Sequence, residues 1–152
     1  MSKSKIILSI CVVILAVLGG IFFFQNRSGV GGDAPEVDWR KLGELDYISG
    51  KASPDLAALE GKMVRIPGFM VPLEDSQKSV TEFLLVPTPQ ACIHVPPPPP
   101  NQMVLVEMDA SAQAKVEFGP IWVYGILSLH SKRHQYGESS FTMKGMRIEQ
   151  YR

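Results

Sequence analysis

Cys92 and His94 are the residues of this 152-residue sequence whose types and spacing best suit a chemical role. In an extended segment, residues i and i+2 project to the same side, so both side chains could approach one metal ion. A thiolate and an imidazole together suit zinc or copper(I). Two ligands do not complete a site, and His130 and His134 are the other histidines of the chain. These four residues form the predicted metal site if their loops converge.

Each of these residues also has a structural interpretation. A C-x-H pair is less specific than paired C-x-x-C motifs, and a lone Cys92 also suits a buried small residue or a reactive thiol. His94 could bond only to loop carbonyls, and His130 and His134 could be solvated. The sequence shows no metalloprotease, phosphate-loop or nucleophile-elbow motif, and no third residue that would orient Cys92 and His94. It therefore favours a protein that is not an enzyme, with a Cys92 thiol enzyme as the least favoured hypothesis.

The Cys92–His94 pair lies in the connection 87–102, with the sequence PTPQACIHVPPPPPNQ. A connection of this length without regular structure is usually functional or disordered. Its five consecutive prolines predict a polyproline II rod about 15 Å long. The rod could brace the domain or dock a partner. The predicted binding residues are Pro96, Pro97, Pro98, Pro99, Pro100, Asn101 and Gln102.

Residues 6–24, IILSICVVILAVLGGIFFF, carry no charge and predict one transmembrane helix. At helical rise this segment spans about 28 Å, close to the thickness of the hydrocarbon core. Lys3 and Lys5 precede it and only Arg27 follows closely, which places residues 1–5 in the cytoplasm. The expected location is the bacterial inner membrane, crossed once, with the C-terminal domain in the periplasm.

An uncleaved signal anchor is favoured over two alternatives. Phe22, Phe23 and Phe24 close the segment where a cleaved signal peptide needs small residues. Most of the apolar run follows Cys11, which is therefore expected to be a helix residue and not a lipid attachment site. Residues 25–35, QNRSGVGGDAP, are typical of a flexible linker.

Residues 36–152 are expected to form one periplasmic domain. Residues 36–50 look irregular or partly helical, and Ser53, Pro54 and Gly61 suit the cap, first turn and stop of a short helix. Strands are predicted at residues 62–73, 82–86, 103–108, 121–130 and 141–151.

Irregularities within these strands predict how the sheet is shaped. Pro67 and Gly68 indicate a bend in the first strand, and the pattern slips at Gly145, which indicates a bulge. Trp122 and Tyr124 share a strand face with Ile126 and are expected in the core. The fold prediction is mainly β: a small five-stranded OB-like barrel with a short helix. A five-stranded open sheet or an SH3-like barrel is the alternative.

Charge excludes one class of partner. The chain carries 15 basic and 15 acidic residues, and three of the basic ones, Lys3, Lys5 and Arg27, flank the apolar segment. The remainder is mildly acidic, which argues against a nucleic-acid surface.

The runs GKMVRIPGFMVPL (61–73), FLLVP (83–87) and ACIHVPPPPPNQ (91–102) resemble a bacterial family of exported proteins, many of them lipoproteins, known only as a domain of unknown function. The resemblance extends over residues 36–152. It implies an envelope location and an accessory role in metal homeostasis beside ABC-type permeases. Its signature falls on Cys92, His94 and the 96–102 segment, and this chain departs from the lipoprotein members in its anchor.

The sequence thus predicts a membrane-anchored periplasmic accessory or binding protein, linked to metal homeostasis or to an ABC-type transporter. Zinc or copper would be its cofactor. The alternative is a metal-free protein-interaction module of the cell envelope.

Overall fold

The structure is a computed structural model that describes residues 34–76, 78–89 and 97–151. Its helices are α2 (Trp39–Leu42), α3 (Pro54–Ala57) and the 3-10 helix η1 (Pro100–Gln102). Its strands are β1 (Met63–Pro72), β2 (Ser79–Val80), β3 (Glu82–Val86), β4 (Val104–Met108), β5 (Ala114–Lys115), β6 (Pro120–Ser128), β7 (Lys132–His134), β8 (Gly137–Ser139) and β9 (Phe141–Gln150). The predicted anchor 6–24 lies outside the described residues, among which no helix is long and apolar enough to cross a membrane.

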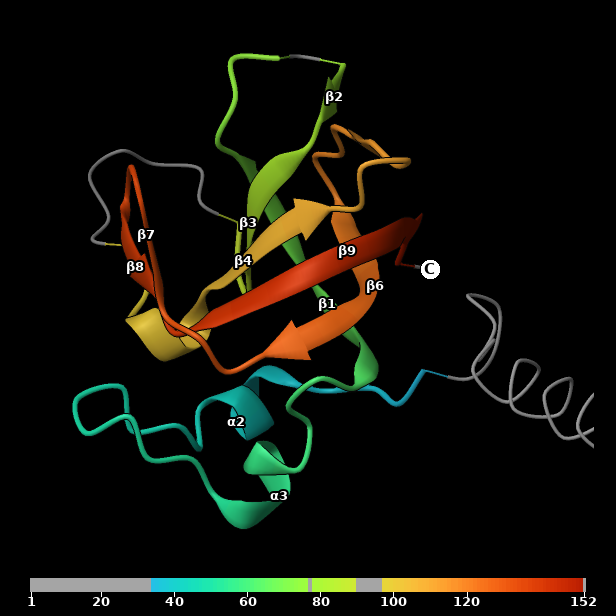
Figure 1. Cartoon of the computed structure of the whole chain (residues 1–152). Coiled ribbons are helices and arrows are strands. Elements are labelled where there is room, and N and C mark those ends of the chain that lie inside the picture. Colours follow the sequence, from blue (N-terminus) through green and yellow to red (C-terminus); the bar gives the residue numbers. More distant parts are fainter. Residues whose placement is uncertain (1–33, 77, 90–96, 152) are drawn as a thin grey trace, which may run out of the picture. The chain divides into compact units, whose positions relative to one another are not determined.

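Five strands close into a barrel in the order β1-β3-β4-β9-β6, with β6 pairing back onto β1 (Figure 1). Every neighbouring pair is antiparallel except β4 and β9, which are parallel. Counted along the chain, the barrel strands follow the order 1-2-3-5-4, which is the Greek-key closure of an OB fold. The predicted mainly β, five-stranded OB-like barrel is confirmed.

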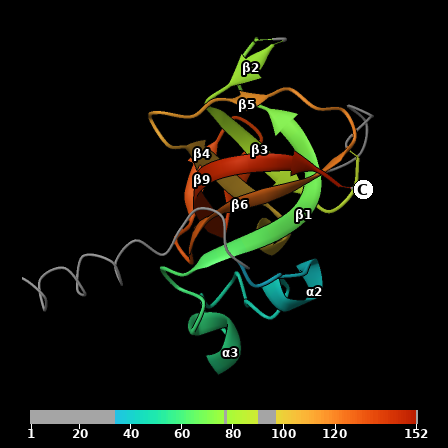
Figure 2. The same cartoon turned by 90° about the vertical axis from the view of Figure 1, so that its right-hand side faces the viewer.

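The strand predictions are correct to within two residues at each end, and two short ribbons were missed. β2 pairs with β5, and β7 pairs with β8 across the two-residue turn Gln135-Tyr136, between the predicted strands 121–130 and 141–151. The β2–β5 ribbon lies at one end of the barrel and the helices α2 and α3 lie at the other (Figure 2).

Alternate residues of β1 face the interior of the barrel. Every second residue from Val64 to Met70 is buried. β1 pairs with β6 over its first seven residues and with β3 over its last four, so the bend predicted at Pro67 and Gly68 lies directly before Phe69, the residue that pairs with both strands. The predicted bulge is also present. Tyr124 pairs with Arg147 and Gly125 with Gly145, which leaves Met146 as the extra residue.

The segment before β1 plugs one end of the barrel. Val37, Leu42 and Leu56 are buried in the same apolar cluster as the barrel interior. α2 begins at Asp38, whose carboxylate accepts a hydrogen bond from the Lys41 backbone N–H at 2.7 Å. α3 begins as predicted, because the Ser53 side chain accepts from the Leu56 N–H at 3.2 Å and Pro54 occupies its first turn. Side-chain capping thus holds both short helices where their leucines close the core.

The outer face of β3 and β4 is covered, although OB barrels commonly bind ligands there. Leu84 and Leu105 are 2% and 0% exposed, and they form a second apolar cluster. The β7–β8 hairpin lies against this side of the barrel (Figure 1). Lys132 forms an ion pair with Glu107 of β4, and the Gln135 side chain donates to the Leu73 carbonyl at 3.4 Å. The usual OB ligand face is therefore closed in this chain.

Gly68→Ala is expected to lower the free energy of unfolding by about 1–3 kcal/mol, as overpacking does. A Cβ at this position would lie 2.7 Å from the Val86 carbonyl oxygen, a backbone atom held in the β1–β3 pairing. Gly119→Ala is the matched control, because nothing lies within 4 Å of the Cβ it would add. Urea unfolding measures both variants, and equal midpoints would contradict the close approach.

Candidate functional site

The predicted binding segment is described from Pro97 onward, whereas Cys92, His94 and Pro96 lie outside the described residues. Pro99 has φ −62° and ψ 155°, in the polyproline II range. Pro100 begins η1, since the Gln102 backbone N–H donates to the Pro99 carbonyl at 2.8 Å. The prediction that the rod continues through Pro100 is wrong, because proline also suits the first position of a helical turn.

Asn101 and Gln102 use their side chains to fasten η1 to the end of α2. The Asn101 amide donates to the Leu45 carbonyl at 2.9 Å, and the Gln102 amide donates to the Trp39 carbonyl at 3.1 Å. Trp39 in turn donates its indole N–H to the Pro67 carbonyl at 2.6 Å. These bonds satisfy carbonyls around the helix terminus, so both amides brace the domain internally.

The two described histidines differ in their surroundings. His130 is exposed just after β6, whereas His134 is half-buried on β7. Burial lowers the pKa of His134 and favours its neutral form. Its Nδ1 accepts from the Tyr136 N–H at 3.2 Å, and its Nε2 is buried with no hydrogen-bond partner.

This hydrogen bond sets the tautomer of His134. A neutral imidazole that accepts at Nδ1 carries its proton on Nε2, so the buried nitrogen is a donor. A ligating histidine needs a lone pair on the metal side and usually donates from its other nitrogen. Across residues 34–76, 78–89 and 97–151, no three His, Cys, Asp or Glu side chains are grouped so that they could hold a metal ion. The predicted metal site therefore remains a prediction that depends on Cys92 and His94.

A pocket of about 280 Å³ opens between η1, the loop after α2, and the strand ends around the β7–β8 hairpin. We call it the η1 pocket. Its apolar lining is Leu45, Tyr47, Pro100 and Leu129, and its polar side chains are Ser131, Glu138 and Ser140. The Ser140 backbone N–H donates to the Pro100 carbonyl at 2.9 Å, which joins the end of the hairpin to η1. The pocket thus joins three segments that are far apart in the sequence.

A rigid turn forms the rim of this pocket. The Asp46 N–H donates to the Lys51 carbonyl at 2.8 Å, and the Gly50 N–H donates to the Asp46 carbonyl at 2.7 Å. The Asp46 carboxylate accepts from the Ser49 hydroxyl and the Ile48 N–H, and these bonds lower its pKa. Gly50 adopts φ +71°, which suits glycine.

This turn presents apolar side chains to solvent. Tyr47 is 47% exposed and Ile48 is 86% exposed. Because the backbone of the turn is already fixed, a partner would not have to order it on binding.

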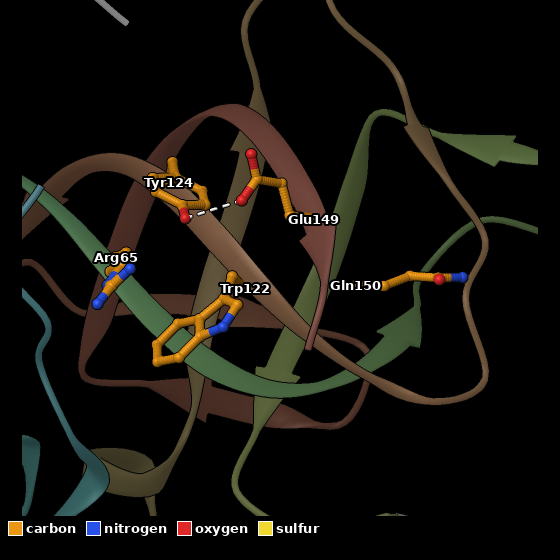
Figure 3. Close-up of a pocket in the computed structure, with 5 residues that line it drawn as sticks. All are labelled: Arg65, Trp122, Tyr124, Glu149 and Gln150. Atoms are coloured by element: carbon orange, nitrogen blue, oxygen red, sulfur yellow. Dashed lines mark hydrogen bonds between the residues drawn. The ribbon is translucent and has the colours of Figure 1, made fainter. Parts of the chain in front are cut away.

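A second, open hollow lies on the side of the barrel and is lined by Arg65, Trp122, Tyr124, Glu149 and Gln150 (Figure 3). Trp122 and Tyr124 project from the outside of β6, so neither is part of the apolar cluster inside the barrel, although Tyr124 is buried, with 8% of its surface exposed. The charged side chains of Arg65 and Arg147 cover this outer face of the strand.

The groups of this hollow already bind one another. The guanidinium carbon of Arg65 lies 4.7 Å from the Trp122 ring centroid, and Tyr151 stacks on the same ring at 4.9 Å. The Tyr124 hydroxyl donates to Glu149 at 2.9 Å, whereas Gln150 points away from the other four residues (Figure 3). The aromatic rings of this face are therefore already covered, although the buried Nε of Arg147 has no hydrogen-bond partner among the described residues.

Gln102→Ala is expected to lower the free energy of unfolding by about 0.5–1.5 kcal/mol, because it removes the side-chain hydrogen bond to the part-buried Trp39 carbonyl, which keeps only its bond from the Gly43 N–H. Gln150→Ala is the matched control, since that amide bonds only to the exposed Glu117 carboxylate at 3.3 Å, and should change stability by less than about 0.5 kcal/mol. Urea midpoints compare the two. A Gln102→Ala cost no larger than that of the control would count against the bracing role.

The chain is similar in sequence and in structure to proteins of one family. A family model described as "Protein of unknown function (DUF3299)" matches residues 47–150. A crystal structure of a DUF3299 family protein from Pseudomonas aeruginosa PAO1 is 30% identical, with a TM-score of 0.60, and the match covers 80% of this chain and 98% of that one. No curated protein matches the chain. This chain belongs to the DUF3299 family of proteins of unknown function.

Proposed function

We propose that this chain is an accessory binding protein of the bacterial envelope, anchored in the inner membrane by residues 6–24 with its barrel in the periplasm. Its domain docks a partner protein, for which an ABC-type permease is the candidate class. Of the two functions predicted from the sequence, this is the metal-free interaction module.

The observation that carries the proposal is the rigid turn beside the η1 pocket. A turn held by its own hydrogen bonds exposes Tyr47 and Ile48 next to a pocket of about 280 Å³. Buried aromatic and apolar anchors at the centre of an interface usually carry most of the binding energy. The side hollow supports a docking role less well, because its rings and charges already bind one another.

Photocrosslinking in cells tests the proposal. With p-benzoylphenylalanine at Tyr47, the full-length chain should form one discrete adduct with an envelope protein. Adding Ile48→Asp should reduce its yield about tenfold, since losing an interface anchor commonly costs that much affinity.

Phe118 supplies the matched control site. It is 94% exposed in the connection between β5 and β6, at the end of the barrel opposite the helices. The same crosslinker there should not produce the adduct. An adduct formed equally from both sites, or from neither, would refute docking at the turn.

Metal binding is the second candidate function, favoured by the buried Nε2 of His134 that lacks a hydrogen-bond partner. If Cys92 and His94 bring a zinc or copper ion to this nitrogen, the ring must change tautomer: Nε2 gives up its proton, Nδ1 takes one up, and the bond that Nδ1 accepts from the Tyr136 N–H is lost. His130 is the fourth predicted ligand. The chain would then serve metal homeostasis.

Metal analysis of the purified full-length chain tests this candidate. About one equivalent of zinc or copper should be retained at micromolar metal and lost in Cys92→Ser, His94→Ala and His134→Ala. His130→Ala shows whether the exposed histidine takes part. Absence of bound metal from the unsubstituted chain would exclude the metal-linked function.

A further inference from the structure

The η1 pocket has an uneven chemical lining. Leu45, Pro100 and Leu129 supply apolar surface, and Tyr47 adds an aromatic ring. Among the described lining residues, Glu138 has the one charged side chain. The pocket is therefore apolar along its wall and acidic at one point.

The Glu138 carboxylate is available to an outside cation. Within the described part of the chain, it forms no ion pair and accepts no hydrogen bond. Arg133 lies directly opposite Glu138 in the β7–β8 register, yet no ion pair joins the two side chains. Glu107 of β4, by contrast, is already paired with Lys132 of the hairpin. Glu138 thus differs from its neighbour in having an unused acceptor.

An aromatic ring, a carboxylate and hydroxyl groups around one cavity suit a guanidinium ion. Arginine stacks its planar group on aromatic rings and donates in a fork to carboxylates. Its methylene stem can lie along apolar surface such as that of Leu45 and Leu129. A volume of about 280 Å³ lies just below the usual range for drug-sized ligands, about 300–1,000 Å³, so one side chain is a fitting occupant.

We propose that the η1 pocket receives an arginine side chain of the partner protein. An apolar residue beside that arginine then packs on Ile48. The source is a protein and not a free small cation, because Ile48, 86% exposed on the fixed turn at the pocket rim, offers contact area that only a longer chain would cover. This inference rests on the proposed function and names the chemistry that the docking site recognises.

Binding of two small probes to the full-length chain in detergent tests the pocket. N-acetyl-arginine amide should shift the ¹³C-methyl signal of Ile48 and the signals of labelled Tyr47, with a dissociation constant in the millimolar range. N-acetyl-citrulline amide has nearly the same shape without the charge and should bind about two- to fivefold more weakly, the effect of losing an exposed ion pair. Equal affinities for the two probes would overturn the inference.

Two substitutions assign the effect to Glu138. Glu138→Gln should weaken arginine amide binding about two- to fivefold and leave citrulline amide binding unchanged. Arg133→Gln removes the cation across the register and should strengthen arginine amide binding or leave it unchanged. If Arg133→Gln weakened binding as much as Glu138→Gln, the carboxylate would not be the receptor and the inference would fail.

The crosslinking experiment distinguishes failure of this inference from failure of the docking function on which it rests. If the specific adduct from Tyr47 persists undiminished in Glu138→Gln, the docking function stands, but the inference that the η1 pocket receives an arginine side chain is refuted. Preferential arginine amide binding without any adduct would refute a protein as the source. Loss of both the adduct and the probe preference in Glu138→Gln is the expected result.

Discussion

Closure of the barrel depends on two paired glycines, at which any side chain would meet atoms of a neighbouring strand. Gly125 on β6 and Gly145 on β9 are paired, and a Cβ on Gly125 would collide with the Lys144 carbonyl oxygen. A Cβ on Gly145 would lie 2.6 Å from the Met108 sulfur. The extra residue Met146 lies at the same place, and a bulge of this kind bends and twists its strand. β9 can therefore pair with β6 on one side and run parallel to β4 on the other, which completes the ring.

A closed ring of five strands still has two ends, and their covering decides where the protein can bind. Leucines from the segment before β1 enter one end, held by the caps of α2 and α3. η1 then fastens the long connection to the same end through Asn101 and Gln102. Because these pieces are joined by hydrogen bonds and not by a continuous sheet, a pocket remains between them. The η1 pocket is a consequence of how the barrel is plugged.

The sides of the barrel are occupied by the chain's own groups. On β3 and β4, Leu84 and Leu105 are buried on the face that other OB barrels leave open. On β6 and β9, arginines lie over Trp122 and Tyr124. Their capacity for stacking and charge pairing is largely satisfied within the domain. A binding role built on the end of the barrel is consistent with that distribution.

Local chemistry was enough to predict the five barrel strands and the short helix α3. Strict alternation in β1, the Ser53–Pro54 helix start and the phase slip at Gly145 each act over a few residues, and each is present in the structure. The β7–β8 hairpin was not predicted because its side chains are polar on both faces, so its sequence has no alternation of apolar and polar residues. Trp122 and Tyr124 were expected in the core because apolar type alone cannot distinguish a barrel interior from an outer face covered by arginine.

The sequence by itself determined the fold class, the order of the strands along the chain and the special position of the proline-rich connection. Only the tertiary structure decided which strands pair, that Asn101 and Gln102 brace α2, and that Tyr47 and Glu138 share one pocket. The physical reason is the distance along the chain over which each interaction acts. Alternation, capping and bulging depend on neighbours in the chain, whereas the η1 pocket joins segments that meet only after the barrel has closed.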